Sequence, residues 1–134
     1  MSLKLYHANW SLCSQMVRVA LAEKGLSYES NHIKLCDHYP KGENLSPEYL
    51  AINPKGIVPA IDLDGEIVTE STNIIKRLNK LTGEKDIDLW PVDVDQDKLN
   101  SWVEDTTITD GVPLGKTLGT AIPPFSLILI NFMV

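Results

Sequence analysis

The chain has little of what marks several large classes of protein. Its 134 residues include only two cysteines, Cys13 and Cys36, too few for the disulfide framework of a small secreted domain. Lys and Arg number 12 against 18 acidic residues, which gives a formal net charge of −6. This shortage of positive charge argues against binding to nucleic acid or to an anionic membrane surface. Because no basic-then-apolar leader opens the sequence, we expect a cytoplasmic protein with free thiols.

Metal-ligand spacing and long apolar runs are also lacking. Cys36 and His38 stand two residues apart without a second paired motif, which fits no structural zinc spacing, so we expect no metal. The apolar run at 125–134 is about half of the roughly twenty residues that a membrane-spanning helix needs. We interpret it as a core helix whose partners lie beyond residue 134, and we therefore expect a truncated chain.

The first third of the sequence predicts a strand, a helix and a second strand. The strand is expected at Leu3–Tyr6 and the helix from Ser11–Ser14 to about Lys24, where Gly25 favours a left-handed helix end. Residues 26–33 predict the second strand. Short connections indicate that these two strands are parallel neighbours joined by a right-handed crossover.

The middle of the chain predicts a hairpin framed by two helices. Asp64-Gly65 between two apolar runs is a strong hairpin signal. The expected elements, in chain order, are a charged loop at 34–44, a short helix from Ser46-Pro47 ending at 53–56, strands at 57–63 and 66–69, and a helix from 70–73 that stops at Gly83.

The last part of the chain predicts a change of domain. Residues 84–96 carry Trp90-Pro91 and several aspartates and are typical of a linker. A helical pattern resumes at Asp97 and runs to about Thr107. We therefore predict a first domain at 1–83, a linker at 84–96, and the beginning of a helical domain at 97–134.

Three positions combine a chemical group with a special backbone site. Cys13 falls in the first turn of a predicted helix, where the helix dipole favours a thiolate, although a small buried filler is an equally good interpretation. Pro59 suits either a trans edge strand or a cis bond that turns Val58 toward a ligand. At the start of the next predicted helix, Ser71 or Thr69 is a candidate cap and Glu70 a complement to the helix dipole. In the alternative interpretation, Ser71 binds the carboxylate of a ligand and Glu70 its ammonium group.

Taken in order, three motifs resemble a known family. They are Ser11-Leu12-Cys13-Ser14, Asn53-Pro54-Lys55-Gly56-Ile57-Val58-Pro59, and Glu70-Ser71 before Ile74-Ile75. Over residues 3–82 this order is similar to the first domain of the glutathione transferase superfamily. The resemblance implies an α/β, thioredoxin-like fold with a mixed four-stranded sheet, followed by an all-helical domain. The first motif is similar to those of zeta-class transferases (maleylacetoacetate isomerases) and tetrachlorohydroquinone reductive dehalogenases.

The resemblance also implies roles for individual residues. Val58, before a cis Pro59, would bind the cysteinyl backbone of glutathione, while Glu70 and Ser71 receive its γ-glutamyl end. Lys55 would reach the glycyl carboxylate. The candidate catalytic residues are Ser11, which matches the serine that activates the glutathione thiolate, and Cys13, which matches the cysteine that forms mixed disulfides in the dehalogenases. Leu12 departs from the isomerase pattern, which has a second serine there.

The function expected from this resemblance is a glutathione transferase that activates the thiolate for attack on a small electrophile. Two alternatives remain open: a glutathionyl-transfer, reductive dehalogenase or isomerase-type enzyme that uses Cys13, and a non-catalytic glutathione-binding module. Members of the family are usually homodimers, so a homodimer is expected. The resemblance implies that the electrophile pocket belongs largely to the helical domain, of which we expect this chain to hold only the beginning.

Overall fold

The computed structural model describes residues 1–36, 41–85 and 87–106, so His38 lies outside the described residues. The chain divides into two compact units at Asp93 and Val94. The elements are β1 (Leu3–His7), α1 (Leu12–Lys24), β2 (Glu29–His32), the 3₁₀ helix η1 (Glu43–Leu45), α2 (Pro47–Leu50), β3 (Ala60–Leu63), β4 (Glu66–Thr69), α3 (Ser71–Asn79) and, in the second unit, α4 (Gln96–Thr106).

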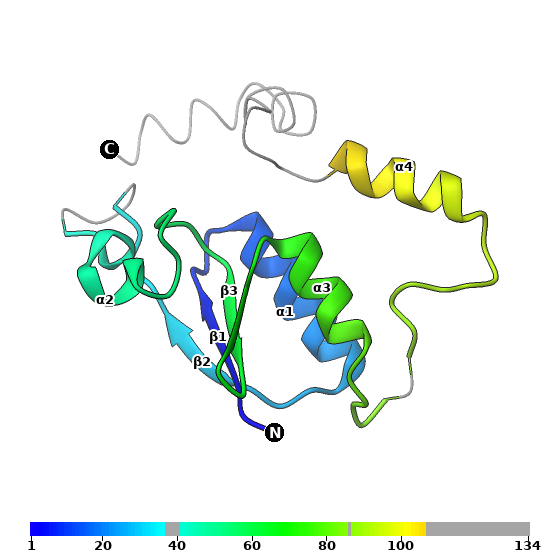
Figure 1. Ribbon diagram of the computed structural model, residues 1–134, viewed down its shortest axis with the longest axis horizontal. Coiled ribbons are helices and arrows are strands. Elements are labelled where there is room, and N and C mark those ends of the chain that lie inside the picture. Colours follow the sequence, from blue (N-terminus) through cyan, green and yellow to red (C-terminus); the bar gives the residue numbers. More distant parts are fainter. Residues whose placement is uncertain (37–40, 86, 107–134) are drawn as a thin grey trace. The chain divides into compact units, whose positions relative to one another are not determined.

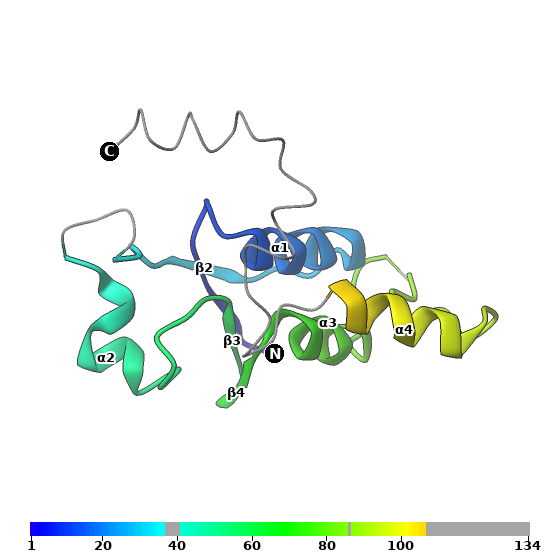
Figure 2. The ribbon, with the colours of Figure 1, turned by 90° about the horizontal axis from the view of Figure 1, so that it is seen from above.

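The first unit is built on one mixed sheet with the strand order β2-β1-β3-β4. Leu5 of β1 pairs with Ser30 of the parallel β2 and with Ile61 of the antiparallel β3. Ile61 in turn pairs with Val68 of the antiparallel β4. Helices α1 and α3 lie side by side on one side of the strands, and α2 lies on the other (Figures 1 and 2). This arrangement confirms the expected thioredoxin-like α/β fold and the parallel first pair.

The core lies between the sheet and the helices α1 and α3. Alternate residues of β1 are buried, as a strand with one covered face requires. Helical spacing buries one stripe of α1 and one of α3. The apolar residues with no exposed surface in this core are Leu5, Val17, Leu21, Ile61, Ile74 and Leu78.

Most element ends follow local signals in the sequence. Gly25 ends α1 in the left-handed conformation, with φ at 63°. Ser46 caps α2 by accepting a hydrogen bond from Tyr49 N. Asp64 and Gly65 both have positive φ, at 51° and 92°, which is the pattern of the tight hairpin turn that this dipeptide predicts.

Three boundaries differ from the predictions. β3 begins at Ala60 rather than at residue 57, and β2 covers only Glu29–His32. Helix α3 ends at Asn79 with Lys80 as its C-cap, so the predicted stop at Gly83 is wrong. Gly83 has another task, because a Cβ there would collide with the carbonyl oxygen of Lys24. The glycine therefore permits a close approach to the end of α1.

The 3₁₀ helix at Glu43–Leu45 falls where the sequence predicted only a loop. Asn44 holds it in place, because its side-chain oxygen accepts from Cys36 N at 2.8 Å and its side-chain nitrogen donates to Gly56 O at 2.9 Å. None of the helices among the described residues is both long enough and apolar enough to cross a membrane.

Candidate functional site

The sheet register gathers three connections at one end of the sheet. β1 runs toward His7, and its residue Tyr6 pairs with Ala60, the first residue of β3. Ala60 also pairs with Thr69, the last residue of β4. β3 runs antiparallel to both neighbours. The end of β1, the start of β3 and the end of β4 therefore lie at the same end of the sheet, and so do the segments attached to them. These segments carry Ser11, Val58-Pro59 and Glu70-Ser71.

Ser11 is the N-cap of α1. Its backbone is extended, with φ at −80° and ψ at 117°, and its Oγ accepts a hydrogen bond from Ser14 N at 3.2 Å. The hydroxyl thus satisfies one of the unpaired amides of the first turn through its oxygen, while its hydrogen can donate to a ligand. Ser14 is fully buried, and its own Oγ accepts from Ala8 N at 3.3 Å.

Further hydrogen bonds hold the segment that leads into Ser11. Ser11 N donates to Ala8 O at 3.2 Å. Gln15 Nε2 donates to Asn9 O at 3.0 Å, and Asn9 N donates to His32 Nε2 at 3.4 Å. These bonds tie the segment to both α1 and β2, so Ser11 is held from two sides. Sequence reasoning missed the contributions of Gln15 and His32, and that of His32 depends on the pairing of β1 with β2.

Cys13 is the second residue of α1 and is partly exposed, so it is not a core filler. The first turn of α1 carries no acidic side chain, which leaves the positive end of the helix dipole uncompensated there. The neighbours Trp10 and Leu12 are 74% and 49% exposed. Exposed apolar side chains therefore flank the two candidate catalytic residues, Ser11 and Cys13.

Val58 precedes β3, and the Val58–Pro59 peptide bond is cis, as the resemblance implied. The preceding carbonyl, that of Ile57, accepts from Tyr49 OH at 2.7 Å and from Asn53 Nδ2 at 2.8 Å. Burial raises the pKa of Tyr49 well above its ordinary value, so the phenol remains a donor. Tyr49 and buried Asn53 thereby fix the chain that enters Val58.

Glu70 occupies the N-cap position of α3 with an unusual backbone, φ 68° and ψ 121°, and its side chain makes no capping bond. Ser71 is the first helical residue and is buried. The alternative in which Ser71 or Thr69 caps this helix is therefore wrong. Unlike the start of α1, the N-terminus of α3 has no side-chain cap from its N-cap residue, a feature that suits an anionic ligand.

Lys55 Nζ forms an ion pair with Glu70 Oε1 at 3.1 Å. The two side chains are 50% and 31% exposed, and a pair of this kind contributes only about 0–1 kcal/mol. Breaking this ion pair therefore costs little free energy. The ion pair also shows that Lys55, from the segment before β3, lies beside the start of α3.

A pair of imidazoles lies beneath the segment that carries Ser11. His7 is buried, and its Nε2 is 2.7 Å from Ser30 Oγ, while its Nδ1 has no partner among the described residues. Its ring meets that of His32 edge-on, with centroids 5.7 Å apart. Burial, followed by the charges of Arg18 and His32, lowers the pKa of His7. In the described ranges no three His, Cys, Asp or Glu side chains are grouped to hold a metal ion.

A mixed sheet in the order β2-β1-β3-β4, with a cis-proline just before β3, is the arrangement of a thioredoxin-like domain. Residues 10–81 match the family model of the glutathione S-transferase N-terminal domain. The match covers more than half of the chain, which therefore belongs to the glutathione S-transferase family.

The curated relatives include the classes that the first motif resembled. The chain is 44% identical over 79 residues to a maleylacetoacetate isomerase from Pseudomonas aeruginosa, with 58% of this chain and 36% of the relative covered. It is 41% identical over 99 residues to a zeta-class glutathione S-transferase from Euphorbia esula, with 73% and 41% covered. A tetrachloro-p-hydroquinone reductive dehalogenase from Sphingobium chlorophenolicum is 32% identical over 77 residues, with 58% and 30% covered.

Solved structures give the same fold. A beta-etherase from Sphingobium sp. superposes with a TM-score of 0.67 at 33% identity, covering 78% of this chain and 42% of the other. A glutathione transferase homologue from Sulfitobacter with bound glutathione gives 0.62 at 25% identity, covering 78% and 50%. The chain thus spans half or less of the length of each of these relatives.

Proposed function

We propose that the chain binds glutathione and activates its thiol for attack on a small electrophile, as the glutathione-binding half of a transferase. The observation that carries this proposal is the Ser11 hydroxyl. It caps α1 through its oxygen, keeps a hydrogen to donate, and belongs to the same end of the sheet as Val58 and Ser71. Helix dipole and hydroxyl both favour a sulfur anion at this position.

The energies are of the required size. Lowering a thiol pKa by one unit corresponds to about 1.4 kcal/mol of preference for the thiolate. A hydrogen bond to a charged partner contributes roughly 1.5–3 kcal/mol. One donor at the N-terminus of α1 is therefore sufficient to lower the glutathione pKa by about one to two units. From an ordinary thiol pKa of about 8.5, this raises the thiolate fraction at neutral pH roughly eight- to twenty-fivefold.

The remaining candidates bind the tripeptide. The main chain of Val58 pairs with the cysteinyl backbone in the manner of an added strand, next to Pro59. Glu70 takes the γ-glutamyl ammonium, and Ser71 with the first amides of α3 takes the adjacent carboxylate. Lys55 exchanges its ion pair with Glu70 for the glycyl carboxylate.

The electrophile meets an apolar surface. Exposed Trp10 and Leu12 stand on either side of Ser11 in the sequence. Leu12 occupies the position at which the isomerase pattern has a second serine. We expect the helical domain of the whole protein to complete this pocket, and we expect a cytoplasmic homodimer.

A second route uses Cys13. Its partial exposure in the first turn of α1 and the reductive dehalogenase among the relatives favour this candidate. The Cys13 thiolate attacks glutathione disulfide, a Cys13–glutathione disulfide forms, and one glutathione thiolate leaves. Treatment with glutathione disulfide should add one glutathione to the wild-type mass and none to a Cys13→Ser variant. An unmodified wild type would remove this route.

Ser11→Ala tests the main proposal, and Ser46→Ala is its matched control. Both serines cap a helix with a hydroxyl oxygen, at 3.2 Å in each case, so both variants should lose about 1 kcal/mol of stability. Only Ser11→Ala should raise the pKa of bound glutathione, measured by the ultraviolet absorbance of its thiolate. An unchanged pKa in a folded Ser11→Ala variant that still binds glutathione would exclude Ser11 as the donor.

A further inference from the structure

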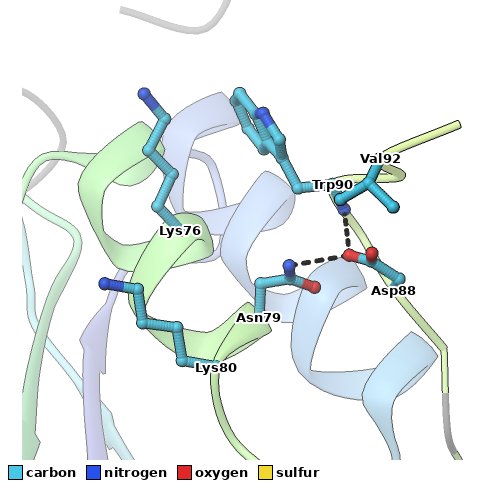
Figure 3. A pocket seen from close by; sticks show the side chains of 6 residues that line it. All are labelled: Lys76, Asn79, Lys80, Asp88, Trp90 and Val92. Atoms are coloured by element: carbon cyan, nitrogen blue, oxygen red, sulfur yellow. Dashed lines mark hydrogen bonds between the residues drawn. The ribbon is translucent and has the colours of Figure 1, made fainter. Parts of the chain in front are cut away.

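A pocket lies away from the candidate glutathione-binding residues. Its volume is about 350 Å³, and it lies between α3 and residues 88–92 (Figure 3). The lining residues, here called the lysine–tryptophan pocket, are Lys76, Asn79, Lys80, Asp88, Trp90 and Val92. At 1.5 Å per residue, Asn79 is about 12 Å along α3 from Ser71. The pocket therefore belongs to the opposite end of the helix from the proposed glutathione contacts.

The walls of this pocket are held by hydrogen bonds, so the pocket is preformed. Asn79 Nδ2 donates to Asp88 Oδ1 at 2.8 Å, and Leu89 N donates to Asn79 Oδ1 at 2.7 Å. Trp90 N donates to the same Asp88 oxygen at 2.8 Å. Figure 3 shows the resulting arrangement, with Asn79 between the two lysines and Trp90, Val92 and Asp88. Leu89, next to Trp90, packs against the core.

Positive charge gathers here on a chain that is acidic overall. Lys76 and Lys80 are exposed and one turn apart, so they share a face of α3. Within the described part of the chain, no carboxylate lies within salt-bridge distance of either ammonium. Lys24 is buried behind Asn79, where its ammonium donates to Asn79 O at 3.1 Å and to Ile87 O at 3.0 Å.

Among the residues that the structure describes, Asp88 is the only acidic one in the lining. Its Oδ1 is already engaged by Asn79 and by the Trp90 amide, and these hydrogen bonds lower its pKa. The lining thus has two lysines against one carboxylate, and that carboxylate already accepts two hydrogen bonds. The balance of charge in the pocket favours an anion.

The apolar part of the pocket favours an aromatic ligand. Lys76 Nζ lies 4.9 Å from the centroid of the Trp90 ring, so a cation and an aromatic surface are presented together. Val92 and the aliphatic stems of the lysines add apolar surface. A volume near the low end of the 300–1,000 Å³ typical of small-molecule sites matches a ligand of one or two rings.

We propose that the lysine–tryptophan pocket binds a small planar aromatic anion, with its ring against Trp90 and its acid group at the ammonium groups of Lys76 and Lys80. The inference is independent of glutathione binding, because none of its residues is a candidate glutathione contact.

Equilibrium dialysis of the full chain with 2-naphthoate tests this proposal, with neutral 2-naphthamide as the matched probe. The naphthoate should bind at least fivefold more tightly than the amide. Lys80→Gln should raise the Kd for naphthoate three- to tenfold, and Trp90→Ala should raise it at least tenfold. Lys80 is exposed, so its variant is expected to fold even if Trp90→Ala does not.

Lys98→Gln is the control variant. Lys98 lies over Trp102 at 5.1 Å on α4, which reproduces the cation–aromatic pair without the pocket, so its loss should leave the Kd unchanged. The proposal is overturned by equal binding of the two probes, by an unchanged Kd in Lys80→Gln, or by an equal loss in Lys98→Gln. Absence of naphthoate binding at millimolar concentration, or its displacement by glutathione, would also overturn it.

Discussion

Glu70 has a backbone conformation that residues other than glycine rarely adopt, with φ at 68°. A non-glycine residue in this region costs on the order of 1–3 kcal/mol, and such residues gather at ligand sites. Glu70 is also the residue expected to receive the ammonium group of glutathione, and it pairs with Lys55 in the unbound protein. We propose that the strained conformation orients the Glu70 carboxylate toward the ligand at the expense of stability.

Two substitutions at Glu70 separate strain from binding. Glu70→Gly and Glu70→Ala both remove the carboxylate and its ion pair, so both should weaken glutathione binding at least tenfold. Only glycine relieves the positive φ, so we expect Glu70→Gly to be more stable than Glu70→Ala by about 1 kcal/mol in urea unfolding. Equal stabilities of the two variants would show that the backbone at residue 70 is not strained.

His7 makes the stability of the domain depend on pH. Burial lowers its pKa in the folded state below the ordinary value of 6.5. Above that value His7 is neutral in both states, and its effect on stability is constant. As the pH falls below 6.5, the unfolded chain takes up a proton before the folded chain does, so stability decreases until the folded-state pKa is passed.

The pH dependence is measured by urea unfolding at about pH 7.5 and about pH 5.5, values that bracket the ordinary histidine pKa. The wild type should lose more stability between the two than a His7→Gln variant. If both chains lose the same amount, the decrease comes from other groups.

At the scale of elements, local sequence signals predicted most of the helices and strands. The boundaries that differ from the predictions lie where contacts between distant segments act. Ser11, Gly25 and Asp64-Gly65 act within a few residues of themselves, and each acts as predicted. Gly83 also carries a local stop signal, yet α3 ends before it. Gly83 instead permits a close approach to Lys24, which is a contact between distant segments and is not visible in a local pattern. The 3₁₀ helix at 43–45 was missed for the same reason, since Asn44 is held by Cys36 and Gly56.

In the candidate site, too, some features follow from local sequence signals and others from contacts between segments. Its residue types and spacing are visible in the sequence, including the proline whose preceding bond is cis. Supports that act over a longer separation are not visible: His32 accepts from the main chain of Asn9, 23 residues away, and Tyr49 donates to that of Ile57, 8 residues away. Their roles depend on pairing and packing between segments, which no local pattern encodes.

Lys24 joins three elements and should be important for stability. It is buried at the end of α1 and donates to carbonyls at the end of α3 and in the segment after it. Lys24→Met keeps the aliphatic stem and leaves both carbonyls without a donor, so we expect a loss of about 1–2 kcal/mol. The control is Lys85→Met, because exposed Lys85 donates to Ala22 O at 3.1 Å; it should cost less than about 0.5 kcal/mol. Equal losses in urea unfolding would contradict this account.

At the scale of the whole molecule, the first compact unit reaches Asp93, whereas the sequence pattern places its end at Gly83. Leu89 packs against the core, and the Ile87 carbonyl binds Lys24. We therefore propose that residues 84–93 act as part of the first domain.

Two fragments test this boundary. Residues 1–93 should unfold cooperatively, and residues 1–83 should be less stable by about 2 kcal/mol, because they lack the Leu89 contact and the Ile87 acceptor. Thermal unfolding followed by circular dichroism compares them. Equal midpoints would place the end of the domain at residue 83.

The central claim is that one end of the sheet binds glutathione through the N-termini of α1 and α3 and the main chain of Val58. Amide chemical shifts of the labelled full chain during a glutathione titration test it most directly. We predict that the resonances of residues 11–14, 58 and 70–73 move together with one Kd, while those of Lys76, Lys80 and Trp90 do not. A folded chain whose resonances stay fixed, or move only outside these three segments, would contradict the account.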